Sequence, residues 1–312
     1  MSLTQDQLAK LNSLADSGDY LALAFMDLLA QETSIFGDQS DGDLVADGTT
    51  TVAALGSAPS LNVYTLTRDV FCNNLTVNAG VTIKTAGFRI FCSNTVLVKA
   101  TGAIVANGAD ASAGTAGAGS VANVVKGGAA GGAGGTANGN GAAGSSQGTA
   151  GIGGAGGAGG NSAAGGTGGA ASTITAPVAN MGGYRNVYAG LNGVLLGTGS
   201  AQALFGGGGG SGGGADNANV GGGGGGGGGV LVLAARVVNN QGTISANGGD
   251  GAAGTAGNAG GGGGGGGGAV FLIYRYLFGS NPVANGGALG AKSGTGSNGS
   301  AGAAGRVIKL LA

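Results

Sequence analysis

The stretch Gly221-Gly-Gly-Gly-Gly-Gly-Gly-Gly-Gly229 runs directly into the apolar segment Val230-Leu-Val-Leu233, and the run Gly261 to Gly268 likewise precedes Val270-Phe-Leu-Ile273. Flexible glycine linkers are usually diluted with serine and do not feed repeatedly into segments that resemble buried strands. The same unit occurs twice within this chain. The pattern therefore predicts that the glycine runs are ordered parts of the fold.

The overall composition agrees with an ordered chain. Glycine accounts for 80 of the 312 residues, but there are only three prolines, which excludes a collagen triple helix. Charged residues make up 8% and hydrophobic residues 42%, the opposite of a typical disordered chain. The net charge of −1 provides no attraction to nucleic acid or to an anionic membrane. We expect neither as a partner.

Residues 1–32 differ in composition from the rest and predict two short helices interrupted at Asp16-Ser-Gly-Asp19. A small amphipathic pair of this kind cannot bury its apolar face alone, so it is expected to dock on another protein or on symmetry-related copies. Packing on the glycine-rich part of its own chain is the alternative. The predicted docking face consists of Leu8, Leu11, Leu21, Phe25 and Leu28.

Residues 33–60 are interpreted as a polar connector and residues 61–108 as a β-repeat region. In the latter, Val70-Phe-Cys-Asn-Asn matches Ile90-Phe-Cys-Ser-Asn, and Ile83 to Gly87 matches Ile104 to Gly108. A repeat of about 20 residues in apolar segments predicts stacked β-strands. The two cysteines, Cys72 and Cys92, are then expected to be buried on neighbouring strands as thiols, with a disulfide as the alternative.

Residues 109–312 are interpreted as a glycine-rich body that ends in a strand at Arg306-Val-Ile-Lys-Leu-Leu311. Strands are expected to alternate with Asn-Gly turns and with glycine tracts in the polyglycine-II conformation, which has three residues per turn and needs neighbouring chains for its hydrogen bonds. Gly225 and Gly265, inside the unbroken runs, are predicted core positions. The alanine-containing tract Gly153 to Gly160 is expected to be peripheral.

The predicted fold class is therefore mainly β and polyglycine-II. Short N-terminal helices come first, then stacked β-strand repeats, then a layered bundle of polyglycine-II helices alternating with short strands. No stretch approaches the roughly 20 apolar residues that span a bilayer, so no membrane insertion is expected.

The glycine tracts, together with the β-repeat region before them, resemble the glycine-rich tip adhesins and related fibre proteins of tailed bacteriophages. The resemblance covers about residues 100–300 and implies a virion protein, assembled in the host cytoplasm, that forms an exposed tail fibre or adhesin for host attachment. It also implies a homo-oligomer, by analogy a homotrimer. Other virion proteins are the expected partners of residues 1–60, and a host cell-surface receptor is the expected partner of the body.

The sequence predicts no enzyme, cofactor or metal site. It contains no histidine, and two cysteines alone cannot complete a zinc site. No pair of carboxylates stands out as a general acid and base. Glycine runs match dinucleotide-binding motifs trivially, while the alternation of strands with long helices that such a fold requires is missing.

One long segment, residues 172–205, interrupts the glycine pattern and contains Tyr184, Arg185 and Tyr188. Aromatic and arginine side chains on loops commonly carry recognition, so these three are the candidate receptor-binding residues. The alternative is that the segment closes the end of the bundle with a small apolar cluster.

Two other functions remain open at this stage. A fibre or decoration protein on the phage capsid would have the same kind of body. An ice-binding protein is the alternative of another class, because known examples are bundles of polyglycine-II helices.

Overall fold

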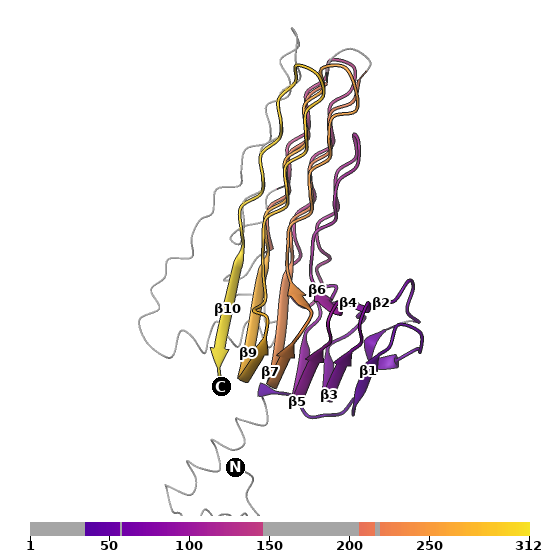
Figure 1. The fold of residues 1–312 in the computed structure, drawn as a ribbon, viewed down its shortest axis with the longest axis vertical. Helices are drawn as coiled ribbons and strands as arrows, with labels where there is room; N and C mark the ends of the chain where they lie inside the picture. Colours follow the sequence, from indigo (N-terminus) through magenta and orange to yellow (C-terminus); the bar gives the residue numbers. More distant parts are fainter. Residues whose placement is uncertain (1–34, 57, 146–205, 216–218) are drawn as a thin grey trace, which may run out of the picture.

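The computed structural model describes residues 35–56, 58–145, 206–215 and 219–312 (Figure 1). These residues form ten β-strands and one 3-10 helix of three residues, η1 (Ala53–Leu55). In this part of the chain, no helix has the length and apolar character needed to cross a membrane.

The strands form two sheets in which all neighbouring strands are parallel. The larger sheet contains, in spatial order, β1 (Leu44–Ala46), β3 (Val70–Val77), β5 (Ile90–Val98), β7 (Val230–Asn240), β9 (Ala269–Gly279) and β10 (Arg306–Leu311). The smaller sheet contains β2 (Val63–Thr65), β4 (Thr82–Lys84), β6 (Ala103–Val105) and β8 (Thr243–Ser245).

From β2 to β9 the chain alternates between the two sheets. Parallel neighbours require a crossover connection, and here a short strand of the smaller sheet forms part of each crossover between long strands. Val70 pairs with Ile90 and Ile83 with Ile104, so the repeat seen in the sequence aligns residues that are neighbours in the sheets. Gly80, Gly87 and Gly102 lie between strands.

Apolar side chains cover both faces of the larger sheet. Leu231 and Leu233 of β7 belong to the main core between the two sheets. Val230 and Val232 alternate with them and therefore point to the opposite face, where they pack with Phe271. Burial on both faces is typical of parallel sheets and explains why the strands that follow the glycine runs are apolar without alternation.

The predicted fold class is wrong. The described residues are mainly parallel β-sheet, and the glycine-rich part does not form a separate bundle, because β7, β9 and β10 extend the sheet that β3 and β5 begin. β7 pairs along the edge of β5 that faces away from β3, so the apolar strand that follows the glycine run finds both backbone partners and an apolar neighbour there. Apart from the single helical residue Ile35, helix in the described residues is limited to η1. The helices predicted within residues 1–32 lie outside the described residues.

Glycine-rich segments leave the sheets after β6, β8 and β9 and return to β7, β9 and β10. We call their described residues, within 106–145, 206–229, 246–268 and 284–305, the glycine array. Figure 1 shows that its legs run side by side away from the strands and form a long, narrow rod. The legs are joined to one another by backbone hydrogen bonds.

The run Gly221 to Gly229 lies inside this array, and all of its residues are buried. Every N–H and every C=O in the run is bonded to another part of the chain. The partner changes with a period of three: Gly222, Gly225 and Gly228 all donate to the leg 260–266 and all accept from the leg 207–213. The remaining residues bond the legs 106–112, 114–120, 129–135 and 246–252, apart from the Gly229 carbonyl, which accepts from Ala269.

Asparagine and aspartate side chains connect three parallel legs. Asn107 Oδ1 accepts the N–H of Asn247 at 2.7 Å, and Asn247 Oδ1 accepts the N–H of Asn285 at 2.8 Å. One step further along the legs, Asp110 Oδ1 accepts the N–H of Asp250 at 2.8 Å. We call this row the Asx ladder. The prediction of Asn-Gly turns is therefore wrong, because these residues enter straight legs.

The two cysteines occupy the predicted positions. Cys72 and Cys92 are register partners on β3 and β5, and both are fully buried free thiols. The interaction with the Cys92 sulfur, together with burial, raises the pKa of the Cys72 thiol. The prediction of buried thiols on neighbouring strands is confirmed.

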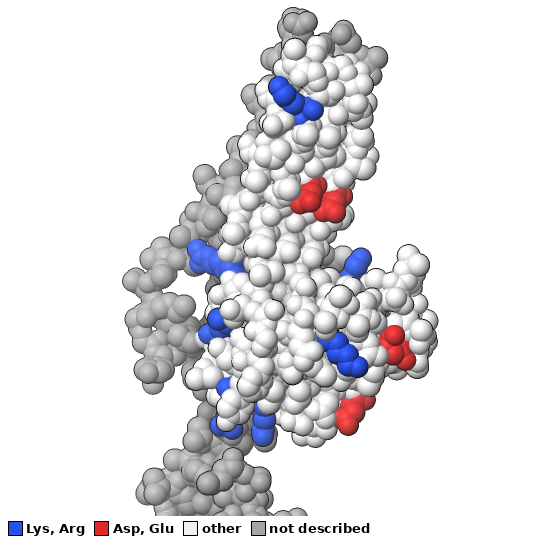
Figure 2. Space-filling model, viewed as in Figure 1, with Lys and Arg blue, Asp and Glu red and all other residues white. Residues whose placement is uncertain are grey.

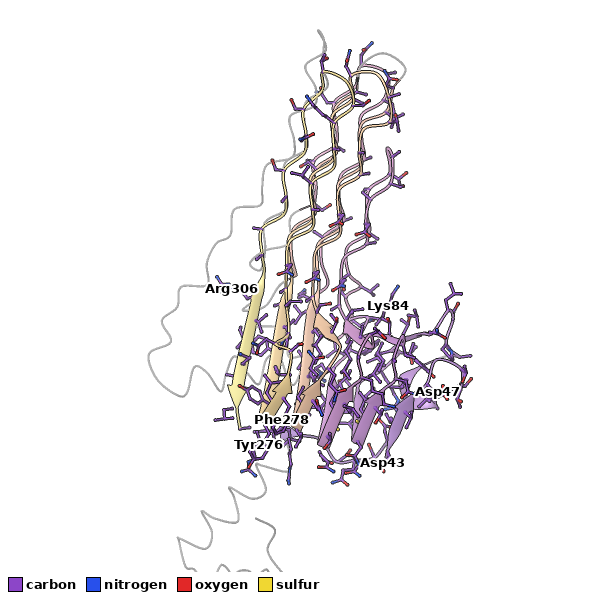
Figure 3. The ribbon with its side chains drawn as sticks, in the orientation of Figure 1. Asp43, Asp47, Lys84, Tyr276, Phe278 and Arg306 are labelled. Atoms are coloured by element: carbon purple, nitrogen blue, oxygen red, sulfur yellow. The ribbon has the colours of Figure 1, made fainter. Side chains whose placement is uncertain are left out.

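Hydrogen-bonded carboxylates gather beside β1, whereas basic residues surround β9 and β10 (Figures 2 and 3). The Arg68 guanidinium lowers the pKa of Asp41, and the Asn74 and Asn73 amides lower the pKa of Asp43. Hydrogen bonds from Thr50, Thr49 and Tyr64 hold the pKa of Asp47 well below its usual range. These bonds tie the loop around η1 to the first strands.

Acidification is expected to destabilise the protein through these carboxylates. Because their pKa values are depressed on folding, their contribution to stability is complete above about pH 4 and is lost as the pH falls through the folded values. The melting temperature should therefore drop between about pH 4 and about pH 2. The Asp47→Asn variant should show a smaller drop than the parent. A melting temperature that stays constant over this range would contradict the assignment.

Candidate functional site

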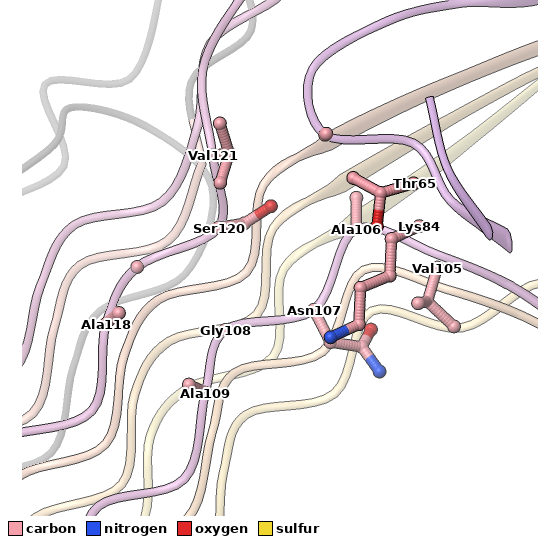
Figure 4. Close-up of a pocket in the computed structure, with 12 residues that line it drawn as sticks. Thr65, Lys84, Val105, Ala106, Asn107, Gly108, Ala109, Ala118, Ser120 and Val121 are labelled. Carbon is pink, nitrogen blue, oxygen red and sulfur yellow. The ribbon is translucent and has the colours of Figure 1, made fainter. Parts of the chain in front are cut away.

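A groove lies where the smaller sheet meets the glycine array (Figure 4). Its volume is about 350 Å3, and it is lined by Thr65, Lys84, Ala86, residues 105–109 and residues 118–121. We call it the Lys84 groove. In the whole molecule it sits at the junction between the strands and the rod (Figure 3).

The smaller sheet presents one side of the groove. Thr65 is the register partner of Lys84, which in turn is the partner of Val105. Their neighbours in sequence, such as Tyr64 and Ile83, are fully buried in the core. Because side chains alternate along a strand, Thr65, Lys84 and Val105 point away from the core and form a row on the outer face.

The glycine array supplies the opposite side. After β6 the chain runs outward through residues 106–112 and returns through residues 116–120. The returning chain is then attached to the turn between β4 and β5, where Asn123 Nδ2 donates to the Ala86 carbonyl at 2.6 Å and Val125 N–H donates to the Gly87 carbonyl at 2.9 Å. These bonds hold residues 118–121 across from Lys84.

The orientation of the Asn107 amide is determined by its partners. Its Oδ1 accepts the Asn247 N–H at 2.7 Å and the Ser245 hydroxyl at 3.0 Å. A backbone N–H can only donate, so the oxygen must face Asn247 and the Nδ2 amine remains as a donor. Figure 4 shows the Asn107 side chain beside that of Lys84.

The groove is electropositive. None of the described residues that line it is a carboxylate, a cysteine or a histidine. The ion pairs within the described residues join Arg68 to Asp41 and Arg89 to Asp69, so Lys84 takes part in none of them. A lining of ammonium, amide, hydroxyl and aliphatic groups can bind a ligand but contains no nucleophile paired with a general base. The geometry therefore suits binding.

The predicted site residues are only partly within the described chain. Gly225 and Gly265 lie in the glycine array, where a Cβ on either would come within 2.0 Å of a backbone oxygen. The predicted receptor-binding residues Tyr184, Arg185 and Tyr188 lie outside the described residues, as does the tract Gly153 to Gly160. The same holds for the predicted docking face of Leu8, Leu11, Leu21, Phe25 and Leu28.

The sequence reasoning did not single out the groove. Asn107 belongs to the repeat Ala106-Asn-Gly-Ala-Asp110 and Ala246-Asn-Gly-Gly-Asp250, but this pattern by itself predicts a turn. The sequence indicates Lys84 less clearly. Lys84 is charged, whereas the equivalent position in the following repeat is the apolar Val105. Neither signal shows that residues 118–121 return to close the groove.

No protein-family model matches this chain. Neither a curated protein nor a solved structure matches it. The groove and the array are therefore interpreted from their own geometry, and the likeness to phage fibre proteins rests on the sequence motifs.

Proposed function

We propose that this protein is a non-enzymatic component of a tailed-bacteriophage virion, an exposed tail fibre or adhesin that mediates host attachment. The observation that carries the proposal is the rod. A stiff scaffold that holds loops away from the particle is what an attachment protein needs, and the array provides backbone bonding on all sides of Gly221 to Gly229.

The turns between the legs gather at the far end of the rod. Thr255 N–H donates to the Val220 carbonyl at 3.0 Å, Thr295 N–H donates to Asn258 Oδ1 at 3.0 Å, and Thr136 forms a bridge with Val220. The C-terminus lies at the opposite end, beside the strands (Figure 1). This separation fits a protein that presents the turns of its rod away from the strands.

We further propose that residues 1–60 attach the protein to other virion proteins and that the protein assembles as a homotrimer. The apolar positions Leu8, Leu11, Leu21, Phe25 and Leu28 supply the attachment face in this proposal. Light scattering on the purified protein measures the stoichiometry. A monomer at micromolar concentration would contradict the trimer but not the proposed role in host attachment.

Host attachment is tested with the Tyr184→Ala, Arg185→Ala, Tyr188→Ala triple variant. If these residues contact the receptor, the variant should fold like the parent while its binding to host cells falls at least about a hundredfold, since interface anchors contribute about 1 to 3 kcal/mol each. An unfolded triple variant would indicate that residues 172–205 support the fold by closing the end of the glycine array. A parent protein that does not bind cells would contradict the adhesin function.

The location of the protein on the virion distinguishes a tail fibre from a capsid fibre. Antibody labelling of intact virions should mark the tail or its fibres. Labelling of heads would favour the capsid fibre or decoration protein instead, and absence from purified virions would contradict a virion protein altogether.

A further inference from the structure

We propose that the Lys84 groove binds one acidic sugar unit, a hexuronate, of a cell-surface polysaccharide. The chemistry follows from the groove itself, whereas its use as a receptor subsite rests on the proposed role in host attachment. The site is separate from the segment 172–205 in sequence and lies at the base of the rod (Figure 3).

The size of the groove limits the ligand. A volume of about 350 Å3 is at the lower end of small-molecule sites and accommodates one sugar ring with part of its neighbour. The groove is also open to the surface, so one sugar unit of a longer polymer can occupy it while the rest of the polymer stays outside. A nucleotide is less suitable, because the lining within the described residues contains no aromatic side chain to stack on a base.

The charge of the groove selects a carboxylate. Lys84 is the only ionisable residue among the described residues that line the groove, and it carries a single positive charge. A carboxylate also carries one charge and is matched by one ammonium group. A phosphate monoester carries close to two negative charges and is usually held by arginine forks or by several backbone N–H groups. The described part of the chain contributes no arginine to the groove.

The remaining lining suits a sugar ring. The Nδ2 amine of Asn107 and the hydroxyls of Thr65 and Ser120 are hydrogen-bonding groups with no side-chain partner among the described residues, and they can meet sugar hydroxyls. Val105 and Val121 offer aliphatic surface for the C–H face of the ring. Figure 4 shows Lys84 and Asn107 on one side of the groove and Ser120 and Val121 on the other, so both sides offer polar groups to a sugar ring.

The test is a calorimetric titration of the full-length protein with trigalacturonate and, separately, with its methyl ester. The ester keeps the rings and hydroxyls but lacks the charges. Trigalacturonate should bind with a Kd of about 1 mM or lower, and the ester at least about tenfold more weakly, because the charge-assisted bond to Lys84 is lost. Lys84→Gln should weaken trigalacturonate binding to the same extent, while Lys84→Arg retains most of it.

The matched control is Lys99→Gln, which removes an exposed lysine outside the groove and should leave binding unchanged. Equal affinity for the acid and its ester, or for the parent and Lys84→Gln, would overturn the proposal. So would the absence of trigalacturonate binding, or its competition by inorganic phosphate at equal affinity, which would make the groove a general anion site.

Cell binding distinguishes this proposal from the attachment function. If the parent and Lys84→Gln bind host cells equally and trigalacturonate does not bind, the groove proposal fails while the adhesin function stands. If the parent does not bind cells but binds trigalacturonate through Lys84, the adhesin function fails and the sugar site remains.

Discussion

Replacing Gly225 with alanine is expected to lower the free energy of unfolding by about 3 to 5 kcal/mol, at the upper end of overpacking effects. A Cβ at this position would lie 2.0 Å from the Gly249 carbonyl oxygen and 2.9 Å from that of Asp250. Neither oxygen can move freely, because backbone hydrogen bonds hold the leg 246–252 on several sides. Chemical denaturation followed by circular dichroism measures the loss.

The matched control enlarges a side chain on the surface of the same array. Ala304 is exposed in the last leg, whereas Gly302 and Gly305 of the same leg are partly buried. The Ala304→Val variant should change the free energy of unfolding by less than about 0.5 kcal/mol. Equal losses in the two variants would contradict the dense packing of the array.

The second large effect is expected at the ion pair between Arg89 and Asp69. The Asp69 carboxylate accepts the Arg89 backbone N–H at 2.8 Å and the guanidinium Nε at 2.9 Å. Both side chains are largely buried, with 11% and 13% of their surface exposed. The Asp69→Ala variant would leave a buried guanidinium without this partner, so we expect a loss of about 3 kcal/mol.

The pair between Arg68 and Asp41 is the matched control. The Arg68 side chain is 48% exposed although that of Asp41 is only 9% exposed, and Asp41 retains the Phe71 N–H as a partner when Arg68 is removed. The Arg68→Ala variant should therefore cost at most about 1 kcal/mol. If thermal unfolding shows the same loss for Asp69→Ala and Arg68→Ala, burial does not decide the strength of these pairs.

Much of the sheet could be predicted where repeats are close in sequence. The match of Val70 with Ile90 gave the correct register, and the last strand was predicted at its observed bounds of Arg306–Leu311. The pairing of β6 with β8 could not be read in the same way. Val105 and Ser245 are neighbours in the sheet although a long glycine-rich excursion separates them in the chain. Strand periodicity alone does not show that the chain returns to the same edge.

The groove was unpredictable for a related reason. Its two sides come from β4 and from the returning chain near Ser120, which meet only because Asn123 and Val125 bond the turn at Ala86 and Gly87. These are contacts between irregular segments, and no spacing in the sequence encodes them. The Asx ladder illustrates a different error, since an Asn-Gly pair can enter a straight leg when its side chain is bonded by the adjacent leg.

The period of three in the hydrogen bonds of the array limits how this protein can evolve. An insertion of one or two residues in a leg would rotate all following residues toward the wrong neighbours and would break the Asx ladder beyond that point. An insertion of three residues restores every partner, provided that all the legs bonded to it gain three residues as well. Rod length can therefore change only in discrete steps, whereas the turns at the far end, which tolerate replacement as exposed loops do, can diversify independently.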